Sequence, residues 1–170
     1  MLQNVKVRPE QIGDAEAIFR ITELAFRSCP YGNHTEQYII EELRRSDALS
    51  VSLVAEIDTQ IVGHIAFSPV EISDGSKNWY ALGPVSVTPQ FQEQGIGTAI
   101  INAGLDVLRT LKAERCVLVG EPSFYARFGF RNYPNLTFDG VPQQYVQSLT
   151  FGKHSASGKV THHAAFNAKG

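Results

Sequence analysis

The sequence predicts one α/β domain built around a mixed, mostly antiparallel β-sheet. Apolar strands at 51–57 and 61–72 are separated by only three residues, which is typical of an antiparallel hairpin. An apolar strand at 79–87, an amphipathic helix at 98–112 and an apolar strand at 116–119 follow, and this order predicts a right-handed parallel crossover. A chain of 170 residues usually forms one domain with a sizeable core.

The N-terminal part of the chain adds one strand and two helices to this prediction. A short strand at 5–8 ends at a proline, and charged residues spaced among apolar ones predict a helix at 14–26. A second helix is expected from about 35 to 45, where Asn33 and Glu36 fit a capping box. The loop between the two helices is rich in turn formers.

The C-terminal part is expected to complete the sheet. The strand at 116–119 is apolar throughout, so both of its faces should be covered. A short helix at 123–128 and a strand near 130–133 are expected next. Two late strands are expected at 145–151 and 160–163, joined by a mobile connection.

Composition and charge exclude several classes of function. The net charge of −2 and the lack of a basic block give no reason to expect nucleic-acid binding. No apolar run approaches membrane-spanning length and no signal region is evident, so we expect a cytoplasmic protein without membrane contact. Cys29 and Cys116 form neither a disulfide framework nor a zinc spacing, and the five histidines do not predict a metal site.

A glycine-bearing turn at residues 91–98 (FQEQGIGT) stands between the strand at 79–87 and the helix that follows. A turn of this kind leaves backbone N–H groups unpaired at the positive end of the helix dipole, which suits a phosphate group. A Rossmann turn would need a small residue where Ile100 stands, and a P-loop would need Gly-Lys-Ser/Thr, which does not occur. The turn therefore predicts an anionic ligand of another class.

The dipeptide Gly83-Pro84 interrupts the strand that leads into this turn. Proline cannot donate to a strand ladder and glycine is a weak strand former, so the pair indicates a β-bulge. The alternative is that the dipeptide merely ends an edge strand. Apolar residues on both sides favour the bulge.

Two motifs together resemble the GNAT superfamily of N-acetyltransferases. The first is Gln92-x-x-Gly95-x-Gly97, and the second is Tyr125-x-x-Phe-Gly-Phe, which ends at Phe130. The run from Leu82 to Phe130 is similar to this family in order and spacing. The resemblance identifies residues 1–170 as a single N-acetyltransferase domain with its core match over 5–150, and the segment 158–166 resembles a YhbS-like bacterial subgroup.

The resemblance implies a sheet that is splayed between its fourth and fifth strands and flanked by helices. It also implies acetyl-CoA as cosubstrate and no metal. The fourth strand would pair with the pantetheine arm, and the glycine turn would cradle the pyrophosphate. The implied cofactor-binding residues are Val85, Ser86, Val87, Gln92, Gln94, Gly95, Ile96, Gly97 and Thr98, and Arg127 and Arg131 are further candidates for the CoA phosphates.

Tyr125 is the catalytic residue that the resemblance implies, because its hydroxyl stands at the motif position that meets the thioester sulfur. A phenol with a pKa of ~10 is a weaker acid than a thiol at ~8.5, so full proton transfer to the leaving thiolate is uphill by about 2 kcal/mol. Hydrogen-bond stabilisation or proton relay suits Tyr125 better. The other interpretation is that Tyr125 only packs with neighbouring aromatic residues. The base stays unassigned, with Glu121 the nearest candidate and Glu71 and His64 behind it.

We therefore expect an enzyme that transfers an acetyl group to a primary amine of a small molecule or peptide by direct attack. One alternative is a non-catalytic acyl-CoA-binding regulatory module. Another is a phosphate- or nucleotide-binding interaction protein that uses the same turn. The acceptor, the acyl-chain preference and the assembly, including a homodimer, are not specified by the sequence.

Overall fold

The computed structural model describes residues 4–30, 33–153 and 155–170. Its sheet has the strand order β1-β2-β3-β4-β5-β7, with β8 paired to the far part of β3 and β6 paired to β8. The strands are β1 (Val5–Pro9), β2 (Val51–Ile57), β3 (Gln60–Ile72), β4 (Trp79–Val87), β5 (Arg115–Val119), β6 (Leu136–Phe138), β7 (Val146–Thr150) and β8 (Gly158–His162). The β4–β5 and β6–β8 pairs are parallel and the others antiparallel, which confirms the mixed sheet.

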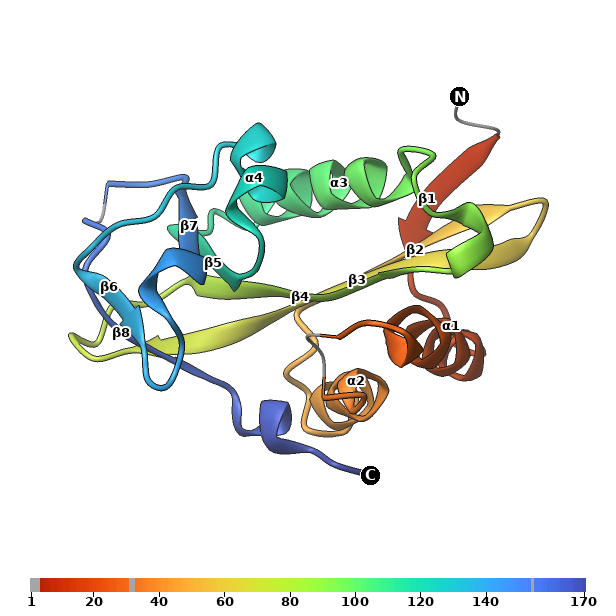
Figure 1. Cartoon of the computed structure of the whole chain (residues 1–170), viewed down its shortest axis with the longest axis horizontal. Coiled ribbons are helices and arrows are strands. Elements are labelled where there is room, and N and C mark those ends of the chain that lie inside the picture. Colours follow the sequence, from red (N-terminus) through yellow and green to blue (C-terminus); the bar gives the residue numbers. More distant parts are fainter. Residues whose placement is uncertain (1–3, 31–32, 154) are drawn as a thin grey trace.

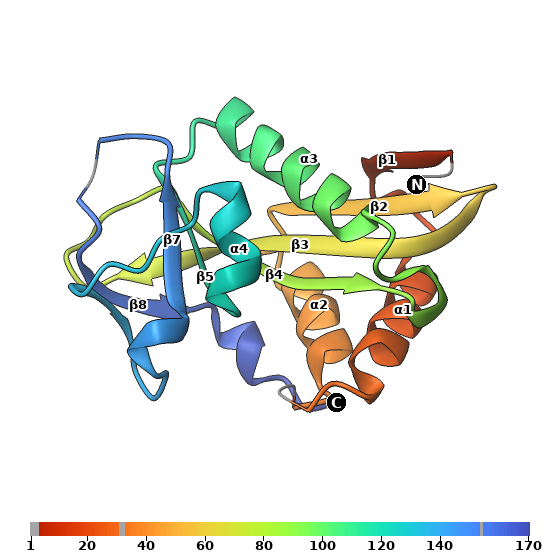
Figure 2. The ribbon, with the colours of Figure 1, turned by 45° about the horizontal axis from the view of Figure 1, so that its top comes forward.

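The helices cover both faces of this sheet (Figures 1 and 2). Helices α1 (Ala15–Arg27) and α2 (Glu36–Arg45) lie on one face, and α3 (Ile96–Thr110) and α4 (Pro122–Tyr125) lie on the other. Short 3-10 turns occupy Pro89–Phe91, Ala126–Phe128, Gln143–Tyr145 and Ala164–Asn167. Among the described residues, no helix is long and apolar enough to cross a membrane.

The main core lies between α3 and the sheet. Ile100 and Leu108 of α3 are fully buried there, together with Ile65 and Phe67 of β3. A methyl group added at Gly104 would overlap the Phe67 ring, so this glycine lets α3 approach the sheet closely. The close approach fixes the position of the whole helix, including its first turn.

The strand β4 bulges and then separates from β5. Two residues of β4, Gly83 and Pro84, face the single residue Ala66 of β3. Parallel pairing between β4 and β5 covers only Trp79–Ala81, while β4 stays paired with β3 as far as Val87. The predicted bulge and splay are therefore confirmed, and the interpretation of Gly83-Pro84 as a strand end is wrong. The separation leaves one edge of β4 open.

Three sequence expectations about local structure are corrected. The helix α3 begins at Ile96, two residues before the predicted start, because Gly95 caps it with a φ of +87°. Residues 130–133 form no strand but one isolated bridge to β7, since Pro134 follows and has no N–H to extend the ladder. The strand β6, which follows this proline, was not expected. Helix α2 is capped at Thr35, and only half of the expected capping box is present, the N–H of Asn33 donating to Glu36.

The segment 158–166 that resembled a bacterial subgroup fastens the C-terminal part to the domain. Its first half is β8, which pairs with β3. The His162 ring then stacks on the Phe166 ring at 4.1 Å between centroids, and Ala165 is buried against Leu43 of α2. The burial of His162 lowers its pKa to about 4.

Candidate active site

The glycine turn and α4 together line one cavity of about 460 Å³, on the side of the sheet that carries α3. Its lining residues are Val87, Phe91, Gln92, Glu93, Gly95, Gly97, Thr98, Phe124 and Arg127. Five of the predicted cofactor-binding residues thus meet at one cavity. Phe91, Glu93 and Phe124 were missed, because nothing in their spacing shows that α4 folds back over the turn.

The first turn of α3 presents its backbone to this cavity. No side chain caps the helix and its first turn holds no acidic residue, so its N–H groups are available to an anion. A Cβ at Gly97 would have its nearest neighbour, Cγ2 of Val87, at 3.9 Å, so a ligand has free access to the backbone there. Ile96 is buried in the core and can contribute only its N–H group.

Arg127 brings a positive charge to the same cavity. Its guanidinium lies over the Phe124 ring, 4.5 Å from the centroid, and this contact holds it toward the cavity. Arg131, the other arginine candidate, does not line the cavity, and its backbone pairs with Ser148. The structure thus separates two arginines that the sequence could not distinguish.

The open edge of β4 lies beside the cavity. The N–H of Thr88 donates to the Val62 carbonyl of β3 at 2.9 Å. Because the bonds of an antiparallel ladder alternate, the backbone groups of Ser86 also face β3, while those of Val85 and Val87 face the open edge. The Val87 carbonyl accepts a hydrogen bond from Nε2 of Gln92 at 2.9 Å.

Two of the predicted cofactor-binding residues, Ser86 and Gln94, do not present their side chains to the cavity. The Ser86 side chain is 3 % exposed and lies on the face of β4 opposite to that of Val85 and Val87. Gln94 donates from Nε2 to the Gln90 carbonyl at 3.3 Å and does not line the cavity. The Gln92 side chain is hydrogen-bonded to the last residue of β4, so it links this strand to the turn.

Tyr125 is held at the end of β5 by aromatic contacts and by a glycine. Its ring meets the Phe124 ring edge-on at 4.9 Å and the Phe130 ring at 6.0 Å. A Cβ at Gly120 would lie 2.6 Å from Cε2 of Tyr125, so only glycine lets the ring occupy this position. Burial raises the pKa of Tyr125 above its ordinary value of 10, and the hydroxyl therefore stays protonated at neutral pH.

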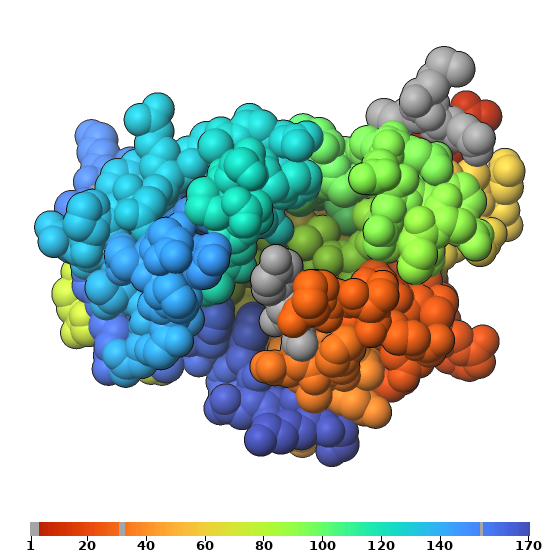
Figure 3. All heavy atoms as spheres, viewed as in Figure 1, coloured from red at the N-terminus to blue at the C-terminus, as the bar shows by residue number. Residues whose placement is uncertain are grey.

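A second cavity of about 380 Å³ lies at the end of β5, and Val119, Gly120, Glu121 and Tyr145 line it. Val119 is 43 % exposed and Tyr145 is 38 % exposed, so apolar surface is open to solvent here. Figure 3 shows a hollow bordered by α4, by the turn before α3 and by the segment that carries α1 and α2, with β4 at its floor. Tyr145 was missed because β5–β7 pairing brings it to Val119 across the sheet.

The candidate bases lie in three different places. Glu121 lines the second cavity and accepts a hydrogen bond from Ser123 at 3.3 Å. Glu71 lies where β3 pairs with β8, and His64 is fully buried on the α1–α2 face of the sheet. Cys116 is also fully buried, which raises the pKa of its thiol. Within the described ranges, no three His, Cys, Asp or Glu side chains group closely enough to hold a metal ion.

Comparison with known proteins relates this chain to one family. The model of the acetyltransferase (GNAT) family matches residues 16–130. The N-acetyltransferase YhbS of Escherichia coli K12 is 31 % identical over 125 residues, which cover 73 % of this chain and 72 % of YhbS.

Solved structures agree with this relationship. A GNAT family acetyltransferase from Brucella melitensis, in complex with acetyl-CoA, is 45 % identical, with a TM-score of 0.86 over 97 % of this chain and 99 % of that chain. The E. coli YhbS structure, in complex with CoA, is 28 % identical, with a TM-score of 0.86 over 100 % of this chain and 96 % of that chain. The chain therefore belongs to the acetyltransferase (GNAT) family.

Proposed function

We propose that the protein transfers the acetyl group of acetyl-CoA to a primary amine of a small molecule or peptide by direct attack on the thioester. One observation carries this proposal: the segment 120–127, which carries Tyr125, contributes lining residues to two cavities, one built on the first turn of α3 and one at the end of β5. A donor and an acceptor could thus meet beside one hydroxyl group.

The first cavity suits the donor. The N–H groups of α3 and the Arg127 guanidinium offer donors to the pyrophosphate. The backbone of Val85 and Val87 at the open edge of β4 offers a strand to the pantetheine amides. The relatives from B. melitensis and E. coli, which hold acetyl-CoA and CoA, support the same assignment here.

Attack by the amine places negative charge first on the thioester oxygen and then on the sulfur. In this proposal the N–H of Val85, which faces the open edge, donates to the oxygen. In this proposal the protonated Tyr125 hydroxyl donates to the sulfur and passes it a proton from the amine. Because the raised pKa disfavours a phenolate, this transfer relies on the incoming proton and not on ionisation of Tyr125.

The second cavity suits the acceptor. The Glu121 carboxylate attracts an ammonium group, and the Tyr145 ring and Val119 offer apolar contact to the carbon chain beside it. The proposal therefore favours a cationic amine with an apolar body. We also propose that the protein acts in the cytoplasm. A measurement of its mass in solution would distinguish a monomer from a homodimer.

A screen of amines, polyamines, amino acids and peptide N-termini tests the proposal, with thiol release and mass of the acetylated product as the two readouts. Amine-dependent release of CoA with a product heavier by one acetyl group is expected. Tight acetyl-CoA binding without turnover on any amine would instead favour a non-catalytic acyl-CoA-binding module. Displacement of CoA by ATP at equal concentration would favour a general nucleotide-binding protein.

A further inference from the structure

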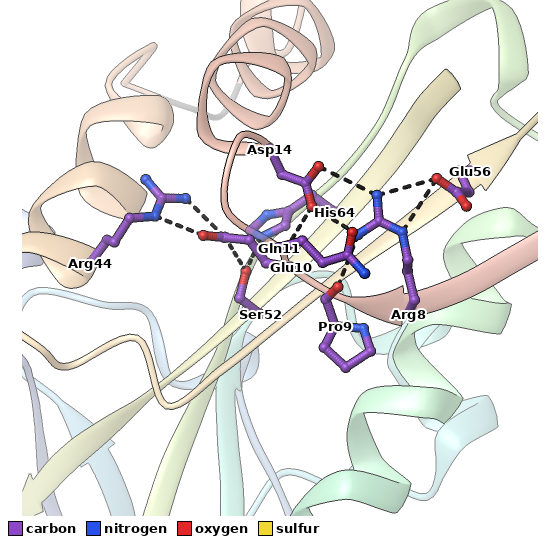
Figure 4. A network of polar contacts seen from close by, with 9 residues as sticks. All are labelled: Arg8, Pro9, Glu10, Gln11, Asp14, Arg44, Ser52, Glu56 and His64. Carbon is purple, nitrogen blue, oxygen red and sulfur yellow. Dashed lines mark hydrogen bonds and ion pairs between the residues drawn. The ribbon is translucent and has the colours of Figure 1, made fainter. Parts of the chain in front are cut away.

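A chain of polar contacts runs from the protein surface to the α1–α2 face of the sheet (Figure 4). Arg44 of α2 forms two hydrogen bonds of 2.9 Å with the Glu10 carboxylate, which follows β1. Ser52 of β2 donates from Oγ to Glu10 at 2.6 Å, and the same Oγ lies 2.8 Å from Nε2 of His64 on β3. Four segments of the chain thus converge on one imidazole ring.

The direction of these bonds fixes the tautomer of His64. Burial alone would raise the pKa of Glu10, but the hydrogen bonds from Arg44 and Ser52 lower it, so Glu10 is an ionised acceptor. The hydroxyl of Ser52 has a single proton, which goes to Glu10, and its oxygen must then accept from His64. Nε2 of His64 therefore carries the proton, and Nδ1 is a bare acceptor.

This Nδ1 atom is fully buried and has no partner among the described residues. His64 pairs with Ser86 of β4, so both side chains lie on the same face of the sheet. The hydroxyls of Ser86, Thr88 and Ser68 are also buried without a described partner. Folded proteins rarely leave such atoms unpaired, and a row of them on adjacent strands is typical of sites filled by ordered water or by a polar ligand group.

The His64 ring lies across β4 from the open edge of that strand. Ser86 stands between Val85 and Val87, whose backbone groups face the open edge. A proton lost beside Val85 would have only β4 to cross before it reaches Nδ1 of His64, and a water beside the Ser86 hydroxyl would carry it. The side chain of Glu10 is 17 % exposed at the far end, so the chain of contacts opens to solvent there.

We propose that His64, Ser52 and Glu10 form a relay that carries the excess proton of the acceptor ammonium to solvent. This inference rests on the proposed acetyl transfer. The ammonium gives one proton through water to Nδ1, the Nε2 proton moves to Ser52, and the Ser52 proton moves to Glu10 and on to water. The amine lone pair then forms the C–N bond, the C–S bond breaks, and a second amine proton reaches the thiolate through Tyr125.

The His64 ring is a weak base, so it can pass a proton on but does not hold a second proton at neutral pH. Desolvation lowers the pKa of His64 to about 4, although Glu10 acts to raise it and Arg44 acts in the other direction. At pH 7 about one ring in a thousand then carries two protons. A proton that arrives at Nδ1 is therefore released from Nε2, which leaves a neutral ring protonated on Nδ1. After product release, Nδ1 gives this proton to water at the open edge of β4, and Nε2 regains one from solvent through Glu10 and Ser52.

A neighbouring network provides the matched control. Arg8 forms hydrogen bonds with Asp14 and Glu56, at 2.8 Å and 3.2 Å for their shortest contacts, beside the relay in Figure 4. This network is buried to a similar degree but shares no hydrogen bond with His64 or Ser52. Loss of Glu56 should therefore reproduce the structural effect of a broken polar contact without an effect on proton transfer.

The kinetic test compares His64→Gln, Ser52→Ala and Glu56→Gln with an amine that the wild-type protein acetylates. The relay predicts that kcat falls roughly 100-fold in His64→Gln and roughly 10-fold in Ser52→Ala, with KM for acetyl-CoA unchanged. The curved dependence of kcat on the D₂O fraction, expected for several moving protons, should become linear in Ser52→Ala. Unchanged kcat and curvature in both variants, judged per folded molecule from melting curves, would overturn the relay.

The Glu56→Gln variant should keep the kcat of the wild type. If it instead loses as much activity as Ser52→Ala, the polar contacts act through stability alone and the relay is wrong. If His64→Gln fails to fold, Ser52→Ala and its isotope effect decide the question by themselves.

The tautomer can be read without turnover, from ¹⁵N shifts of the His64 ring in the wild-type protein. The relay requires the proton on Nε2 in the resting state, and a proton on Nδ1 in a protein that acetylates amines would overturn the relay alone. A wild-type protein that acetylates no amine would overturn the proposed function, and the relay with it. The two failures are thus distinguishable.

Discussion

The Tyr125 ring rests on Gly120, at a position where a Cβ atom would come within 2.6 Å of the ring carbon Cε2. Gly120 is itself held on both sides, because its N–H donates to the Tyr145 carbonyl at 3.0 Å and its carbonyl accepts from Gln147 at 2.9 Å. The glycine therefore cannot move away from a larger side chain. Placement of the Tyr125 hydroxyl depends on a residue that has no functional group.

Substitution Gly120→Ala should displace the Tyr125 ring and lower kcat by about 10-fold or more, because small misplacements of a reacting group carry large rate penalties. Acetyl-CoA binding should change little, since Gly120 does not line the first cavity. Steady-state kinetics together with calorimetric binding of CoA check both parts. A variant with wild-type kcat would mean that the ring position is unimportant.

Substitution Gly97→Ala tests the first turn of α3. The protein should fold normally, because the added methyl group would have its nearest neighbour at 3.9 Å. The same methyl group would occupy the approach of the pyrophosphate, so KM for acetyl-CoA should rise roughly 10-fold, or about 1.4 kcal/mol, with kcat nearly unchanged. An unaltered KM would place the pyrophosphate elsewhere.

Substitution Arg127→Gln should weaken acetyl-CoA binding several-fold and make the affinity less dependent on salt, because a charge at the cavity is removed. The matched variant is Arg131→Gln, which lies outside the cavity and should bind as the wild type does. Affinities of both variants at low and high salt check the prediction. Equal losses in the two variants would show a general effect of charge and no contact with phosphate.

Stability should fall as the pH drops below 6.5, and His64 should account for part of this loss. Its pKa is lowered to about 4 in the folded protein, so the unfolded chain binds the proton more readily between pH 6.5 and pH 4. The stabilisation is complete above pH 6.5 and is lost as the pH falls toward 4, by up to roughly 3 kcal/mol. Urea unfolding of the wild type and His64→Gln at pH 7 and pH 4.5 measures it.

His162 should contribute a second loss over the same range, because burial also lowers its pKa to about 4. The double variant His64→Gln, His162→Gln should therefore show a flatter dependence of unfolding free energy on pH than either single variant. Equal slopes in all four proteins would mean that neither ring is kept neutral by burial.

The sequence predicted the backbone of β4 and of the glycine turn for a physical reason. Proline without an N–H and glycine without a side chain constrain the backbone locally, so Gly83-Pro84 and Gly95 could be interpreted from their neighbours alone. The bulge, the splay and the turn at the start of α3 all follow from such local constraints.

The cavity at the end of β5 and the contacts of His64 could not be predicted in this way, because tertiary contacts assemble them. Val119 and Tyr145 meet only through the pairing of β5 with β7. His64, Ser52 and Glu10 come from three separate segments, and no spacing between them marks a relay. The strand expected at 130–133 was wrong for a different, local reason, because Pro134 follows it and has no N–H to extend the ladder.

Acetyl-CoA turnover by the Tyr125→Phe variant tests the central claim most directly, with the acetylated amine and the released thiol measured together. The variant keeps the ring packed against Gly120 and removes only the hydroxyl. We predict that kcat falls roughly 100-fold while the dissociation constant of acetyl-CoA is unchanged. An undiminished kcat on an amine that the wild type acetylates would contradict the account.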